Sequence, residues 1–244
     1  MKKPYLKKHS KIDRFDIWIV DGNYIRSNIN LEFTNFGQHY RFNFIPKNEF
    51  WIDKEYGEEE TEYFVQHLLV ENKLMGQGKN YETALEQASI FEKAKRHESE
   101  SIEKYRKDPL NAIRKRFLKN YSKKAQVWIV NGKLVRDFFY TDFTEGGHDL
   151  VYSFVPKNEI WIDDDIGPRE RKLIILHEFH ERNLMFDLLE SKKKDVVSKL
   201  KEDKIRAYHL AHEESNKLEH SFRQNPGGMD QRIRMELNKF IKIK

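Results

Sequence analysis

The chain has 244 residues, no cysteine, 35% charged residues and a formal net charge of +5. The lack of cysteine excludes disulfides and thiolate metal sites, and no apolar run approaches the roughly 18 residues that a membrane span needs. The N-terminus leads into no apolar segment of a secretory signal, so we expect a cytoplasmic protein that does not enter membranes.

The first half of the chain predicts two β-hairpins followed by helices. Asp21-Gly22 lies between two short apolar runs and favours a tight hairpin turn, because such a turn needs a residue that tolerates positive φ. Later apolar residues recur at helical spacing. The predicted elements are strands at 17–20, 24–26, 40–45 and 49–52, and helices at about 58–76, from Tyr81 and after Pro109.

The second half of the chain repeats the first. Residues 17–75 align with residues 127–185 at a constant offset of 110, without a gap. Trp-Ile-Asp, for example, occurs at 51–53 and again at 161–163. Self-similarity at this length indicates two copies of one folding unit.

The same elements are therefore predicted again, interrupted by one lysine-rich insertion at 191–203. They are strands at 127–130, 134–138, 150–155 and 159–162, a helix at about 168–189, and helices on either side of Asn225-Pro226. We predict an α+β protein that is a tandem repeat of two units, residues 1–123 and 124–244. Each unit is expected to be a small antiparallel sheet followed by about three helices.

The two copies differ in polar chemistry at one place. The first reads QHLLVE at 66–71, whereas the second reads LHEFHE at 176–181. Three apolar residues of the first copy, Leu68, Val70 and Leu85, are replaced by Glu178, His180 and His212. Burying unpaired polar groups costs about 1–3 kcal/mol each, so these side chains need each other, an ion or water. The first copy is therefore interpreted as a degenerate scaffold and the second as the functional unit.

The replaced positions predict a metal site. His177 and Glu181 are one helical turn apart and share a face, and an antiparallel neighbouring helix would bring His212 to them. Two imidazoles and one carboxylate suit zinc or another divalent transition metal such as ferrous iron. His180 and Glu219 are the alternative ligands.

The second copy resembles the zincin-like metallopeptidases of the ImmA/IrrE type, on Ile-Trp-Ile-Asp at 160–163, Arg-Glu-Arg at 169–171 and Leu-His-Glu at 176–178. In that family an edge strand leads into a helix with the motif H-E-x-x-H, whose histidines bind zinc and whose glutamate is the general base. The resemblance implies that His177 is a zinc ligand and Glu178 the base. It also implies a peptide or similar bond, in a peptide or protein, as the substrate.

One residue departs from that motif. Glu181 stands where the family has its second histidine. The family's later ligand corresponds to His212 or, as the second choice, Glu219. The resemblance covers about residues 155–220.

The competing interpretation is structural. His67 and Glu71 match His177 and Glu181 although the first copy lacks the other polar residues, and a buried hydrogen-bonded pair would explain them. The protein would then be a non-enzymatic interaction protein. Binding of nucleic acid through basic residues would be one form of it, and a metal site without hydrolysis is a third hypothesis. The densest basic stretch is Arg114, Lys115, Arg116, Lys119, Lys123 and Lys124.

Overall fold

The structure is a computed structural model that describes residues 2–192 and 200–243. The chain forms two compact units. The first contains residues 1–113 and 131–144, and the second contains residues 114–130 and 145–244. This division differs from the predicted boundary after residue 123, because a strand before that point belongs to the second unit and a segment after it belongs to the first.

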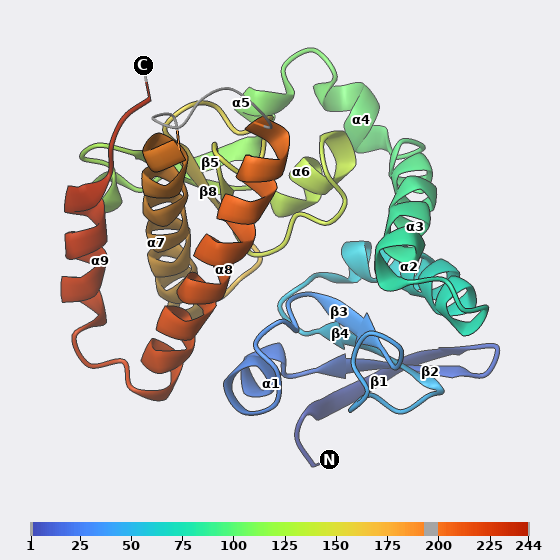
Figure 1. The fold of residues 1–244 in the computed structure, drawn as a ribbon. Helices are drawn as coiled ribbons and strands as arrows, with labels where there is room; N and C mark the ends of the chain where they lie inside the picture. Colours follow the sequence, from blue (N-terminus) through green and yellow to red (C-terminus); the bar gives the residue numbers. More distant parts are fainter. Residues whose placement is uncertain (1, 193–199, 244) are drawn as a thin grey trace. The chain divides into compact units, whose positions relative to one another are not determined.

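The first unit begins with a sheet and continues with helices (Figure 1). Its elements are β1 (Tyr5–Ile12), β2 (Phe15–Val20), α1 (Gly22–Asn28), β3 (Phe36–Gln38), β4 (Glu49–Asp53), α2 (Glu58–Gly76), α3 (Tyr81–Arg96), α4 (Glu100–Tyr105), α5 (Pro109–Ile113) and α6 (Gly132–Phe138).

The sheet of the first unit has the strand order β1-β2-β4-β3. β1 and β3 lie at the edges and run antiparallel to their neighbours, but β2 and β4 pair in parallel. The prediction of an antiparallel sheet was wrong for this central pair. A parallel pair needs a crossover connection, and the segment containing α1 and β3 provides it.

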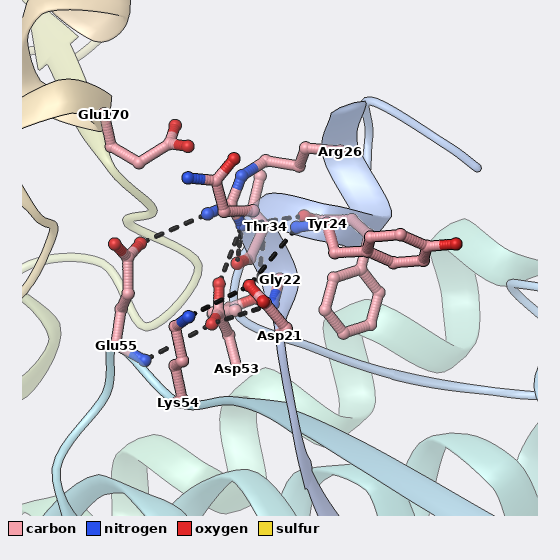
Figure 2. A network of polar contacts seen from close by, with 12 residues as sticks. Asp21, Gly22, Tyr24, Arg26, Thr34, Asp53, Lys54, Glu55 and Glu170 are labelled. Carbon is pink, nitrogen blue, oxygen red and sulfur yellow. Dashed lines mark hydrogen bonds and ion pairs between the residues drawn. The ribbon is translucent and has the colours of Figure 1, made fainter. Parts of the chain in front are cut away.

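The predicted turn at Asp21-Gly22 is instead the start of helix α1 (Figure 2). Asp21 is the N-cap, and its Oδ1 accepts a hydrogen bond from the Tyr24 backbone N–H at 3.3 Å. Asp53 accepts from the Gly22 N–H at 3.2 Å and from Arg26 at 2.8 Å. A Cβ on Gly22 would lie 1.8 Å from the Asp53 carboxylate, so only glycine fits this helix start.

The sheet of the second unit has the same topology, although the helix α6 that follows its second strand belongs to the first unit. The elements of the second unit are β5 (Arg114–Phe117), a 3₁₀ turn (Lys119–Tyr121), β6 (Gln126–Val130), β7 (Gly146–His148), β8 (Glu159–Asp163), α7 (Pro168–Lys192), α8 (Leu200–Gln224) and α9 (Met229–Lys239). The strand order β5-β6-β8-β7 repeats that of the first sheet, again with a parallel central pair. Trp128 pairs with Trp161 as Trp18 pairs with Trp51. The α+β class, with two sheets each followed by helices, is confirmed.

Four predicted strands were wrong. Residues 24–26 and 134–138 lie in helices, and residues 40–45 and 150–155 form turns. The apolar residues of 40–45 suggested a strand. They lie instead in an irregular loop, from which Phe42 and Ile45 pack into a buried cluster with Trp51. The edge strand β1 was missed altogether. Of the predicted insertion, residues 193–199 lie outside the described residues.

Each sheet is covered by its long helix. In the first unit, alternate residues Phe50 and Ile52 of β4 contact Phe64 and Leu68 of α2. The larger core of the second unit joins β6, β8, α7 and α9 through Val127, Ile129, Ile160, Ile162, Leu176, Phe179, Ile233 and Phe240. Within residues 2–192 and 200–243, no helix combines the length and apolarity that a bilayer crossing requires.

Candidate metal centre

The candidate site lies in the second unit, where α7 packs against α8 (Figure 1). α7 also contacts β7 and β8. α7 carries His177, Glu178 and Glu181, and α8 carries His212 and Glu219. The strand–helix order therefore brings residues far apart in the sequence to one place.

The three residues predicted as ligands converge. One ligand atom from each of His177, Glu181 and His212 lies within 4.8 Å of the others. Glu181 Oε2 is 3.4 Å from His177 Nε2 and 2.7 Å from His212 Nδ1. His177 and Glu181 are buried, whereas the His212 side chain is 32% exposed. The cluster is therefore open to solvent on the His212 side.

These atoms fit a tetrahedral ion after a small adjustment. Zinc with bonds of about 2.0–2.2 Å holds neighbouring ligand atoms about 3.3–3.6 Å apart. The separation of 3.4 Å between His177 Nε2 and Glu181 Oε2 lies in that range. The separation of 2.7 Å between His212 Nδ1 and Glu181 Oε2 is a hydrogen bond and would widen when an ion replaced its proton.

Glu219, the alternative ligand, contacts the far side of the His177 ring. Its Oε2 is 2.8 Å from His177 Nδ1. Arg223 donates to Glu219 at 2.9 Å and to Glu170 at 2.7 and 2.6 Å. A carboxylate at Nδ1 fixes the ring so that Nε2 faces Glu181, and metal-binding histidines commonly have such an outer partner. Glu219 therefore orients the His177 ring.

Burial and hydrogen bonds shift the pKa values of the histidine and the carboxyl groups in opposite directions. Burial opposes a charge on His177, but hydrogen bonds with Glu181 and Glu219 outweigh it and raise its pKa well above the usual value. Burial likewise opposes ionisation of Glu181, but hydrogen bonds from three histidines hold its pKa well below the usual range. Glu219 keeps a pKa of about 2 against burial because His177 and Arg223 contact it.

Glu178 is a buried carboxyl group without a hydrogen-bond partner among the described residues. It is 7% exposed, and one of its oxygens forms a group within 4.8 Å with ligand atoms of His148 and Glu181. Burial, and next the charge of Glu181, raise its pKa well above the usual value. It makes no ion pair with Arg171 or Arg182. Arg182 instead pairs with Asp149 at 2.6 Å.

His180, the other alternative ligand, points elsewhere. Its Nδ1 is 3.3 Å from Glu236 of α9, which also accepts a hydrogen bond from Asn183 at 3.1 Å. His180 therefore belongs to the contact between α7 and α9 and is not part of the cluster.

The sequence prediction did not include His148 in the site. This residue ends β7, is fully buried, and its Nε2 is 3.1 Å from Glu181 Oε1. The repeat could have indicated His148, because its counterpart at the offset of 110, Gln38, is also polar.

The first unit has a related but incomplete cluster. His67 Nδ1 is 2.7 Å from Glu92 and its Nε2 is 3.5 Å from Glu71. Contacts with both carboxylates overcome the burial penalty and raise the pKa of His67 to about 9. The aromatic ring of Phe36 lies against His67, with 5.1 Å between ring centroids. Leu85 occupies the position that matches His212, so the third ligand is missing.

Two residues of the predicted basic stretch are paired. Arg114 contacts Glu159 at 2.5 Å, and Lys115 forms an ion pair with Asp164. These pairs reduce the positive charge available to a phosphate backbone.

No protein-family model, no curated protein and no solved structure gives a significant match to this chain. The resemblance to zincin-like peptidases therefore stays a prediction that rests on the residues quoted above.

Proposed function

We propose that the second unit is a metal-dependent hydrolase that cleaves a peptide or similar bond, with His177, Glu181 and His212 as ligands of zinc or a related divalent ion. The convergence of these three ligand atoms, in the copy where His212 and Glu178 replace leucines, is the observation that carries the proposal. The first unit supports the proposal by contrast, because it keeps the histidine–glutamate pair but has leucines at the positions of Glu178 and His212.

Each residue of the cluster has a separate role in the proposed site. His177 and His212 would hold the ion through nitrogen and Glu181 through one oxygen, while Glu219 fixes the His177 ring through a contact of 2.8 Å. An ion held by such ligands lowers the pKa of water and polarises a carbonyl group. Glu178 is the proton acceptor in this proposal, because it directly follows His177 and one of its oxygens lies within 4.8 Å of a carboxylate oxygen of Glu181.

Hydrolysis of a fluorogenic peptide library by the full chain, stripped by chelator and reloaded with Zn²⁺ or Fe²⁺, tests the proposal. We expect activity only after reloading. Glu178→Gln should keep the ion and lose activity by about 10²–10⁴-fold, the usual contribution of a general base. Glu62→Gln, the same substitution at an exposed position of α2 in the first unit, should leave activity unchanged.

Two results would refute this assignment. A wild-type chain that binds no ion would support the structural interpretation of the cluster. A chain that binds an ion but cleaves nothing, with Glu178→Gln indistinguishable from wild type, would indicate a metal site without hydrolysis.

A further inference from the structure

His148 has a defined tautomer. Its Nδ1 is 3.2 Å from the backbone nitrogen of Leu150, in hydrogen-bond geometry. A backbone N–H can only donate, so Nδ1 must accept and cannot carry a proton. In the neutral imidazole the proton then lies on Nε2, which donates to Glu181 Oε1 at 3.1 Å.

The first unit has the same pair of hydrogen bonds, from a backbone N–H to a side chain and from that side chain to a glutamate, but with a different side chain. Gln38 Oε1 accepts a hydrogen bond from the Tyr40 backbone N–H at 2.8 Å. Gln38 Nε2 donates to Glu71 Oε1 at 2.8 Å. Residues 38, 40 and 71 match His148, Leu150 and Glu181 at the offset of 110. A glutamine amide and a histidine protonated on Nε2 thus perform one role, accepting from the strand and donating to the helix.

We propose that His148 is a positioning residue of the metal centre and not a ligand. Its Nε2–H holds Glu181 Oε1, which leaves Oε2 facing His177 and His212. The inference rests on the proposed metal centre, whose ligand geometry it deepens. Glu181 binds the ion through one oxygen because its other oxygen is occupied by this donor.

The alternative is a second ion between His148, Glu178 and Glu181, whose ligand atoms also lie within 4.8 Å of one another. Such an ion needs the lone pair of His148 Nε2. The contact with Leu150 places a proton there instead, and freeing Nε2 would leave either that backbone N–H or the ring proton without its partner. The two hydrogen bonds of His148 therefore favour a single ion at His177, Glu181 and His212 over a second ion at His148.

Substitution at position 148 separates a positioning donor from a ligand. Glutamine keeps the acceptor and the donor, as Gln38 shows, whereas leucine removes both. By isothermal titration of the full chain with Zn²⁺, we expect His148→Gln to bind within about threefold of wild type. His148→Leu should bind about 10–100-fold more weakly, the usual effect of losing an outer hydrogen bond to a ligand. A loss in His148→Gln as large as that in His177→Ala would overturn the inference.

A spectrum of the ion-free protein tests the tautomer without any metal. Long-range ¹H–¹⁵N correlation on the labelled full chain, with His148→Gln to assign the peaks, should show protonated Nε2 and unprotonated Nδ1. The opposite pattern, or protons on both nitrogens, would refute the inference. If wild-type protein binds no Zn²⁺, the proposed metal centre fails, and this spectrum alone decides whether His148 donates to Glu181.

Discussion

The two repeats place the same buried histidine between two carboxylates. Among residues 2–192 and 200–243, only the histidine of the second repeat belongs to a group of three side chains whose atoms lie close enough to hold one ion. His67 and His177 each contact one glutamate from their own helix and one from the next helix. The comparison teaches that this histidine and its carboxylates are a structural element of the fold. What is specific to the second unit is the addition of His212 and Glu178.

The surroundings of the histidine differ in a second respect. In the first unit, Phe36 of β3 covers His67 and packs on Phe64, with 4.7 Å between the phenylalanine rings. The second unit has Gly146 at the matching position, and a Cβ there would lie 3.1 Å from Glu178. An apolar cover over the histidine is thus replaced by backbone that leaves room for a carboxyl group.

The largest effect should come from the arginine that both units bury behind the histidine. Arg96 contacts Glu60 at 2.8 Å and Glu92 at 2.7 Å, as Arg223 contacts Glu170 and Glu219. Arg96→Met and Arg223→Met each remove a buried cation that two buried carboxylates share, so we expect each to lower the free energy of unfolding by about 3–5 kcal/mol in urea denaturation.

Lys217→Met is the control for these arginines, because it removes an ion pair on an exposed lysine and should leave the unfolding midpoint unchanged. A large effect at one arginine with none at the other would break the structural equivalence of the two repeats.

The pH dependence of stability should reveal the charged histidine of the first unit. The pKa of His67 is raised to about 9 in the folded protein, above about 6.5 in the unfolded chain. Its protonation therefore stabilises the fold fully below about pH 6.5, and this stability is lost as the pH rises through about 9, by up to about 1.4 kcal/mol per pH unit.

The difference between wild type and His67→Gln in urea denaturation, measured from pH 6 to pH 10, isolates this contribution. A difference that stays constant over that range would show that His67 is neutral when folded.

A smaller effect is expected where β7 approaches α7. A Cβ at Gly146 would lie 2.7 Å from Ile174 Cγ2 and 3.1 Å from the Trp161 carbonyl oxygen. Gly146→Ala should therefore reduce stability by about 1–3 kcal/mol through overpacking. Gly227→Ala, where the nearest atom is at 3.4 Å, is the matched control and should shift the thermal midpoint little. Equal effects of the two substitutions would contradict the close packing at Glu178.

The smallest expected effect is a gain of binding in the first unit. Leu85→His supplies the missing third ligand beside His67 and Glu71, so titration with Zn²⁺ should detect a second, weaker site. Leu85→Asn is polar but offers no imidazole and should add none. If Leu85→His binds no additional ion, a third ligand is not the only difference between the units.

Sequence reasoning succeeded where a side-chain pattern determines the contact. The i, i+4 spacing of His177 and Glu181, and the matching helix with His212, predicted three side chains that the structure brings within 4.8 Å of one another, because helix faces follow from spacing. Their role as ligands stays a prediction. It failed at Asp21-Gly22, since an aspartate followed by glycine suits both a tight turn and a helix N-cap. It also missed His148, because β7 has only three residues and shows no alternation.

The central claim is that the second repeat holds one ion through His177, Glu181 and His212 and that the first holds none. Metal analysis after equilibrium dialysis of the full chain against Zn²⁺ tests it most directly, with His212→Leu and His67→Gln as the paired variants. We predict one tightly bound ion per chain in wild type and in His67→Gln, and none in His212→Leu. Wild-type protein without bound ion, or loss of the ion in His67→Gln but not in His212→Leu, would contradict it.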